Sequence, residues 1–210
     1  MKKLISLLMA TLMITALFAG CSLGKDPDNG DTEIKKELSR GTIEGTVYKN
    51  DFTGIQFTRP DSWVYSTDEE IAYAMSLGAE FLEGDLKKAL ENSPTVYDML
   101  VTDTLTRTNI NVGFENLAKT LSTNITEEQY FEAMKKQLDN VTSMTVSFPD
   151  KYDTVKLGDN DYLRAVCNVS AMGVNMQQVY YVRKVDKYMS FVIVTIVSGY
   201  TVEDIEAMFN

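Results

Sequence analysis

The sequence predicts an α+β domain in which helices pack on one antiparallel β-sheet. Apolar residues alternate with polar ones through most of 142–198, which is typical of a long antiparallel meander. Two earlier segments, 42–65 and 95–116, also alternate, and each is followed by apolar residues at helical spacing. Because strands and helices are grouped along the chain rather than strictly alternating, this order favours α+β over a parallel α/β fold.

The folded part is expected to begin near Gly41 with a strand over 42–50, where apolar or small residues alternate with polar ones. A second strand is predicted at 55–58. Pro60 should end it, because proline has no N–H to donate to a neighbouring strand. Extended structure is expected to resume at 63–65.

Two helix starts carry capping boxes. Thr67 is followed three residues later by Glu70, and Thr126 is followed by Gln129 in the same way. In this motif the side chains at each start bond backbone N–H groups that have no partner inside the helix. The sequence therefore predicts helices that begin directly after Thr67 and Thr126.

The helix after Thr67 is expected to keep an apolar face as far as Leu82 and to break at Gly84, with a short helix over 85–92. The helix after Thr126 has an apolar stripe opposite charged residues. That stripe is expected to be buried and consists of Tyr130, Phe131, Met134 and Leu138.

The remaining strands follow from alternation and from the composition of the turns. Strands are predicted at 95–103, 108–116, 144–148, 155–157, 163–171, 174–185 and 188–198, with turns at 149–150, 158–161, 172–173 and 186–187. The run 188–198 is almost continuously apolar, which predicts a central strand covered on both faces. Thr201 is expected to cap a final helix whose apolar residues are Val202, Ile205, Met208 and Phe209.

The first 20 residues have the pattern of a secretory signal peptide. Lys2 and Lys3 are basic, Leu4–Phe18 is an apolar core, and Ala19 and Gly20 are small residues of the kind a signal peptidase requires. The apolar core is shorter than the roughly 20 residues that a membrane-spanning helix needs. We therefore expect this segment to be removed rather than to remain as a membrane anchor.

The four residues Phe18-Ala19-Gly20-Cys21 resemble a bacterial lipobox. The resemblance implies cleavage between Gly20 and Cys21 and transfer of a diacylglyceryl group to the thiol of Cys21. Acylation with more than one chain, such as a diacylglyceryl group plus palmitate, would hold the protein stably on a membrane. The alternative is an ordinary signal peptide with a cysteine nearby. We favour a lipoprotein on the extracytoplasmic face of a bacterial cell membrane.

The chain is expected to have three parts: a signal peptide at 1–20, a lipidated and acidic tether at 21–40, and one domain at 41–210. The tether is poor in apolar residues and therefore cannot bury a core. Loss of Lys2 and Lys3 leaves 18 basic side chains against 30 acidic ones in the remaining chain. This net charge of about −12 argues against a nucleic-acid partner.

The sequence has no histidine, which removes both the commonest general base and the commonest metal ligand. It also lacks the short motifs of serine hydrolases, nucleotide-binding loops and thiol oxidoreductases. We therefore expect no catalytic residues, no cofactor and no metal. An enzyme that uses two carboxylates stays open as a third hypothesis, although nothing singles out such a pair.

Acidic turns provide one possible metal site. Asp150, Asp153, Asp159 and Asp161 lie with Asn160 in two neighbouring turns, and oxygen ligands of this kind suit Ca²⁺. Aspartate and asparagine are also ordinary turn residues, and the spacing is not that of a calcium-binding loop. We favour solvated turns.

Cys167 is the one cysteine that follows Cys21, so no disulfide can form inside the domain. It alternates with polar residues and shares a strand face with Leu163, Ala165 and Val169. We expect a small buried apolar side chain rather than a reactive thiol.

Tyrosines offer a possible contact surface. Tyr180 and Tyr181 are adjacent in a predicted strand and must point to opposite faces of the sheet. One of them could lie on an outer face beside Arg164 or Gln178 and contact a glycan or a protein. The alternative, which we favour, is that helices cover both faces and that the tyrosines pack beneath them with their hydroxyl groups in water.

The segment from Phe52 to Trp63, with Gly54, an alternating strand and the Pro60 turn, resembles the opening of Mog1/PsbP-like domains. The order of elements over 42–209 is also similar. The resemblance implies a three-layer α/β/α sandwich around an antiparallel sheet, with Trp63 buried. It also implies a non-enzymatic accessory or binding module. The metal-binding histidines of the photosystem members of that family have no counterpart here.

Two functional hypotheses therefore lead. The first is a cell-envelope lipoprotein that serves as an accessory or protein-interaction module, with an envelope protein as its partner. The second is a lipoprotein that binds a small ligand or a glycan. The sequence does not single out any residue that binds a ligand.

Overall fold

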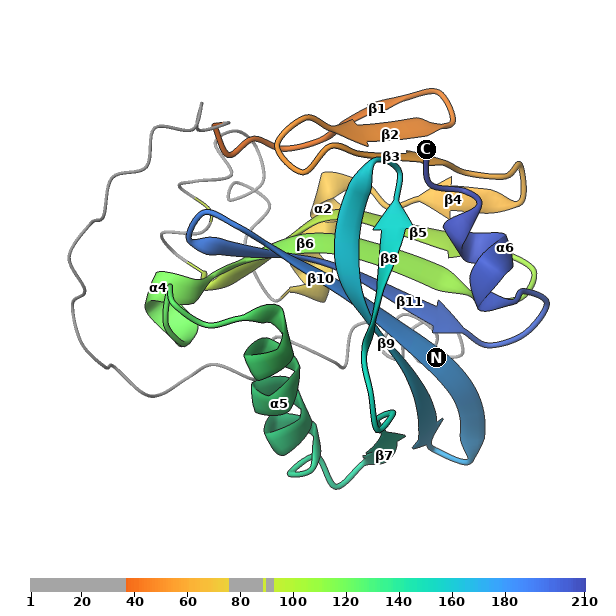
Figure 1. Cartoon of the computed structure of the whole chain (residues 1–210). Helices are drawn as coiled ribbons and strands as arrows, with labels where there is room; N and C mark the ends of the chain where they lie inside the picture. The colour runs from red at the N-terminus through yellow and green to blue at the C-terminus, as the bar shows by residue number, and fades with distance from the viewer. Residues whose placement is uncertain (1–36, 76–88, 90–92) are drawn as a thin grey trace.

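The computed structural model describes residues 37–75, 89 and 93–210 (Figure 1). The expected signal peptide, the lipidation site Cys21 and most of the tether lie outside the described residues. So do the end of the helix after Thr67 and the short helix expected at 85–92.

The described residues form two antiparallel sheets (Figure 1). The smaller has three strands, β1 (Thr42–Glu44), β2 (Val47–Asn50) and β3 (Ile55–Thr58). The larger has eight, β4 (Trp63–Tyr65), β5 (Thr95–Asp103), β6 (Asn109–Asn116), β7 (Met144–Ser147), β8 (Asp153–Leu157), β9 (Asn160–Ala171), β10 (Val174–Val185) and β11 (Tyr188–Ile196). Its order is β4-β5-β6-β11-β10-β9-β7, and β8 pairs with the first part of β9.

The two faces of the larger sheet have different covers. One face, called the helix face here, packs against α2 (Asp68–Ala74), α4 (Leu117–Thr120) and α5 (Glu127–Leu138). The other, called the cap face, packs against the small sheet and α6 (Val202–Glu206). Each face has its own apolar cluster, so the sheet lies between two cores. This arrangement confirms the α+β class with helices packed on an antiparallel sheet.

The small sheet and α6 form one continuous cap. Phe57 of β3 bridges to Phe209 after α6, and their ring centroids are 5.2 Å apart. The backbone N–H of Thr58 donates to Met208 at 3.0 Å, and that of Asn210 donates to Gln56 at 2.9 Å. The C-terminal residues therefore tie α6 to the edge of the small sheet.

β11 is the central strand that the apolar run predicted. It pairs with β6 on one side and β10 on the other, and all nine of its residues are buried. The hairpin turns at 172–173 and 186–187 are also confirmed, with Met172 and Gly173 at positive φ in the first.

The single strand expected at 42–50 is wrong. The segment is a hairpin of β1 and β2, in which Glu44 lies opposite Val47. Gly45 has a φ of +61°, a conformation that glycine adopts without steric cost. A two-residue turn of this kind interrupts the alternation without changing its period, which is why the pattern looked continuous.

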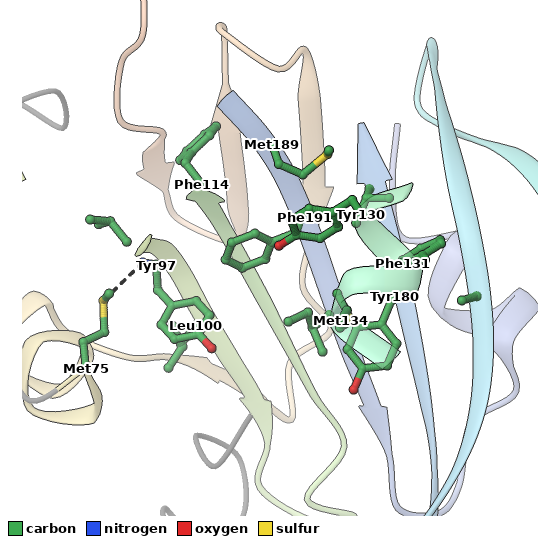
Figure 2. Packing of buried hydrophobic residues seen from close by; sticks show 14 of the residues in the cluster. Met75, Tyr97, Leu100, Phe114, Tyr130, Phe131, Met134, Tyr180, Met189 and Phe191 are labelled. Atoms are coloured by element: carbon green, nitrogen blue, oxygen red, sulfur yellow. Dashed lines mark hydrogen bonds between the residues drawn. The ribbon is translucent and has the colours of Figure 1, made fainter. Parts of the chain in front are cut away.

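Both predicted capping boxes are present. The side chains of Thr67 and Thr126 accept from the backbone N–H groups of Glu70 and Gln129, whose side chains accept in return. The predicted apolar stripe of α5 is the buried one. Figure 2 shows Tyr130, Phe131 and Met134 among the sheet side chains of the helix face. The Thr201 cap of α6 also forms.

Gly113 allows two aromatic rings to meet over the middle of the sheet. It lies opposite Phe191 on β11 and opposite Tyr97 on β5. A Cβ atom on Gly113 would stand 2.4 Å from the Phe191 ring. Without that atom, the rings of Tyr97 and Phe191 pack edge to face with centroids 5.8 Å apart (Figure 2).

A buried carboxylate fastens the start of the domain. Asp98 stands at a bulge in β5 and accepts hydrogen bonds from Tyr48 at 2.6 Å, Asn50 at 3.0 Å and the backbone of Gly41 at 2.8 Å. Arg40 also contacts it and pairs with Asp68 of α2. Among the described residues of the expected tether, Leu38, Ser39 and Arg40 already contact the domain.

Candidate functional site

The cap does not extend over the whole cap face. At the far ends of β7, β9 and β10 the sheet lines a shallow cleft of about 600 Å³, called the open trough here. Its lining consists of Thr145, Ser147, Asn168, Val169, Ser170, Asn175, Met176, Gln177, Ile196, Val197, Ser198 and Tyr200.

Strand register places six polar side chains of the trough on one surface. Ser170 of β9 lies between Thr145 of β7 and Asn175 of β10. Two residues along, Asn168 lies between Ser147 and Gln177 in the same way. Directly opposite residues have Cβ atoms about 5 Å apart, so these two rows form one continuous polar patch.

The six side chains are three hydroxyls and three carboxamides, and each group can both donate and accept hydrogen bonds. Within the part of the chain that the structure describes, none of the six bonds to another protein group. Among the described residues, no charged side chain lines the trough, although 24% of the chain is charged. The trough is therefore a neutral surface with available hydrogen-bonding groups.

Tyr200 forms the wall of the trough nearest the cap. Its hydroxyl accepts from Nε1 of the buried Trp63 at 2.9 Å, and the two rings pack edge to face at 5.5 Å. The loop before it is also fixed, because Thr108 donates to the carbonyl of Ser198 at 3.1 Å and accepts from the N–H of Val197. Contacts with buried residues therefore fix the position of the Tyr200 ring.

A charged network separates the trough from the covered end of the cap face. Arg164 of β9 pairs with Asp153 of β8 and with Glu206 of α6, the latter at 2.7 Å. Tyr181 donates to the same Glu206 carboxylate at 2.9 Å. The hydrogen bond to Asp153 is the main cause that raises the pKa of Arg164. One guanidinium thus pairs with two carboxylates beneath α6.

Tyr180 and Tyr181 point to opposite faces as predicted, and both are buried. Tyr180 stacks on Phe148 with centroids 6.0 Å apart and donates to Gln178 on the helix face. An exposed tyrosine beside Arg164 or Gln178 is therefore wrong. The packing of both tyrosines is confirmed, but their hydroxyls donate to Gln178 and Glu206 rather than to water, and the small sheet covers the cap face together with α6.

Cys167 is buried in the helix-face cluster together with Ala165 and Val169, as expected. Burial raises the pKa of its thiol to about 12, so the group stays protonated at neutral pH. It behaves as a small apolar side chain.

The acidic turns engage neighbouring cations. Asp153 pairs with Arg164, and Asp161 pairs with Lys156 at 3.1 Å. Among the described residues, no group of three acidic or cysteine side chains is arranged to hold a metal ion. The geometry of these turns is that of exposed hairpins on β8 and β9.

One buried carboxylate was not foreseen from the sequence. Glu115 of β6 is fully buried on the helix face, where Tyr130 of α5 donates to its Oε2 atom at 2.6 Å. Its Oε1 atom has no hydrogen-bond partner in the described part of the chain. Burial raises the pKa of Glu115 from 4.5 to about 7, against the effect of that hydrogen bond.

The trough was also missed, although its signal is present in the sequence. Every second residue at the ends of two predicted strands is polar and uncharged: Asn168 and Ser170, then Asn175 and Gln177. That pattern predicts a polar face. What it does not show is that β7 and the loop before α6 complete the cleft.

No family model matches this chain, and no curated protein matches it. None of the helices in the described ranges is long and apolar enough to cross a membrane.

Proposed function

We propose that this chain is a bacterial cell-envelope lipoprotein whose domain serves as a non-enzymatic accessory or protein-interaction module. Acyl chains on Cys21 hold it on the outer face of the membrane. The observation that carries the proposal is Phe18-Ala19-Gly20-Cys21 at the end of a short apolar run.

We also propose that the domain is Mog1/PsbP-like. This resemblance supports an accessory role. Trp63 follows the Pro60 turn and is fully buried in the cap-face cluster. Helices lie on one face of the antiparallel sheet, and on the other face α6 lies beside the small three-stranded sheet. Both features agree with the sandwich that the resemblance implies.

The non-enzymatic assignment is supported by where the reactive groups lie. Glu115 and Cys167 are enclosed in the helix-face core, away from any substrate. The open trough is lined by amides, hydroxyls and apolar groups, none of which is a strong acid, base or nucleophile at neutral pH.

A second candidate, binding of a small ligand or glycan, is favoured by the open trough. A protein-docking surface would be favoured by a broad apolar patch. Among the described residues, the exposed large apolar side chains instead stand on separate elements: Ile43 on β1, Val64 on β4, Tyr73 on α2, Leu105 in the β5–β6 turn, Met172 in the β9–β10 turn and Val197 after β11.

Metabolic labelling with palmitate in a bacterial host tests the anchor. The wild-type chain and Cys167→Ala are expected to carry label and to sediment with membranes. Cys21→Ala is expected to lose both properties. Cys167→Ala is the matched control, because it removes the other cysteine. Labelling or membrane sedimentation of Cys21→Ala at the wild-type level would refute the lipoprotein.

Cross-linking in living cells, followed by mass spectrometry, tests the accessory role. One dominant envelope protein that is captured with the wild-type chain and lost with Cys21→Ala is the expected result. Scattered contacts of equal yield from both chains would overturn that role and leave ligand binding as the stronger candidate.

A further inference from the structure

We propose that the open trough binds a neutral carbohydrate. This inference deepens the second candidate function and rests on the proposed location of the domain in the cell envelope. It assigns the ligand class from the chemistry of the lining.

The absence of charge in the lining selects the ligand. A phosphate, sulfate or carboxylate ligand is usually held by arginine or lysine, and a cationic ligand by carboxylates. Among its described lining residues the trough offers neither, and the charged side chains of Arg164, Asp153 and Glu206 on the same cap face pair with one another. A neutral polar molecule is the class that such a surface binds without leaving a desolvated charge.

The hydrogen-bonding groups match those of a sugar. A sugar hydroxyl both donates and accepts, as do the side chains of Asn168, Ser170 and Gln177. Because the six polar side chains of the trough bond to no other described protein group, a ligand would not have to break internal hydrogen bonds. Amide and hydroxyl side chains lose little when they exchange water for a polyol.

The trough also provides an apolar surface for the carbon-bound hydrogens of a sugar ring. Tyr200 stands at its cap end with Ile196 and Val197. Aromatic rings with one polar end suit partners that are part apolar and part polar. Trp63 fixes the Tyr200 hydroxyl, so the ring is positioned before any ligand arrives.

An extended peptide fits this surface less well. Peptides that add to a sheet bond to the backbone of a free edge strand. β7 is the edge strand of the described sheet, but the polar groups of the trough are side chains on the face of β7, β9 and β10 rather than the backbone groups of that edge. Strand-mounted side chains with a fixed register form a more exact binding surface than a loop does.

Binding should be measured with the full chain purified in detergent micelles, whether or not Cys21 carries a lipid. Isothermal titration would use neutral oligosaccharides of glucose, galactose, mannose and N-acetylglucosamine, with polygalacturonate and heparin as anionic probes. We expect at least one neutral probe to bind and both anionic probes to fail. Failure of every neutral probe, or preference for an anionic one, would overturn the proposal.

Variants locate the site. The double substitution Asn168→Ala with Gln177→Ala should weaken binding by about tenfold or more, since each lost hydrogen bond contributes roughly 1 kcal/mol. Gln56→Ala is the matched control, because Gln56 is another half-buried strand glutamine, on β3 of the small sheet. Equal binding by the double variant and the wild-type chain would contradict the proposal.

The two proposals fail independently. Titration in micelles reports on the trough whether or not Cys21 is acylated in cells. Palmitate labelling reports on Cys21 whether or not the trough binds a sugar. A labelled protein that binds no probe would leave the lipoprotein intact and remove the carbohydrate site.

Discussion

The two ends of the β9–β10 hairpin differ sharply on the same face of the same strands. Beneath the small sheet and α6, β10 presents Val179 and Tyr181, both buried. Beyond the cap, the next two residues on that face are Asn175 and Gln177, which line the open trough. All four residues lie on the same face of the same strand and pair with β9 in one continuous register. The two regions differ in whether the cap covers them.

The difference shows how cover determines the pairing of polar groups. Under the cap, Arg164 and the Tyr181 hydroxyl share the carboxylate of Glu206. In the trough, Asn168 stands four residues further along β9, and its side chain bonds to no other described group. Burial makes an unpaired polar group costly, whereas an exposed one is satisfied by water. Unpaired polar groups therefore cost little in the trough, where water reaches them, and would cost more under the cap.

Removing the cap should have the largest effect. Phe57 of β3 is fully buried against Trp63 and Phe209. Phe57→Ala is expected to lower the free energy of unfolding by about 4 kcal/mol, because it leaves a cavity between the small sheet and α6. Urea unfolding would measure the change. The neighbouring Gln56→Ala is the control, and a loss below about 1 kcal/mol for Phe57→Ala would show that the cap does not stabilise the sheet.

Glu115 tests the cost of a buried polar group with an unpartnered oxygen. The pKa of Glu115 is raised to about 7 in the folded protein from 4.5, so the folded state keeps a proton that the unfolded chain releases between these pH values. Stability should therefore fall as pH rises from about 4.5 to 7, by roughly 3 kcal/mol in total, and level off above that. Below pH 4.5 Glu115 is protonated in both the folded and the unfolded state, so it no longer makes the stability depend on pH.

Glu115→Gln should remove this part of the pH dependence. The measurement is urea unfolding of both proteins at several pH values, with the difference between them plotted. Other carboxylates titrate in both proteins and cancel in that difference. The neighbours of Glu115 in this core include Tyr130 and Tyr97, whose pKa values are raised by burial, so neither ionises in this range. A difference that stays constant from pH 4 to 8 would contradict the raised pKa.

The paired charges under α6 should have a smaller effect. Arg164→Ala removes the ion pairs to Asp153 and Glu206 and is expected to cost about 1–2 kcal/mol, since the arginine side chain is only 19% exposed. The control is Lys156→Ala, which breaks the exposed pair with Asp161 and should cost less than about 0.5 kcal/mol. Equal losses in urea unfolding would show that the cover adds nothing to the pairing.

Much of the fold could be predicted from the sequence where local signals decide the outcome. The three capping threonines, Thr67, Thr126 and Thr201, each start the expected helix, because capping depends on residues only three positions apart. The apolar run in 188–198 is the central strand, because a strand without polar alternation needs cover on both faces.

Features that depend on distant partners could not be predicted. β6 alternates apolar and polar residues, yet Asn109, Asn111 and Glu115 are all buried. The alternation predicted one exposed face, but α5 brings the Tyr130 hydroxyl onto Glu115 from 15 residues away. The trough has the same limit, because Tyr200 completes it from the loop before α6. The alternation of residues along a strand shows which side chains share a face of the sheet. It does not show which elements of the fold cover that face.

The smallest effect is expected in the trough itself, and a reciprocal exchange within β10 measures it. Gln177→Val should change the free energy of unfolding by no more than about 0.5 kcal/mol, because the glutamine is partly exposed and unpaired. Val179→Gln, two residues along the same face, should cost about 2 kcal/mol, because it buries a carboxamide among apolar side chains. If Gln177→Val destabilises the protein as much as Val179→Gln does, then Gln177 has a structural role and is not a group held available for a ligand. If Gln177→Val leaves the free energy of unfolding unchanged but loses carbohydrate binding, then this side chain acts in recognition and not in folding.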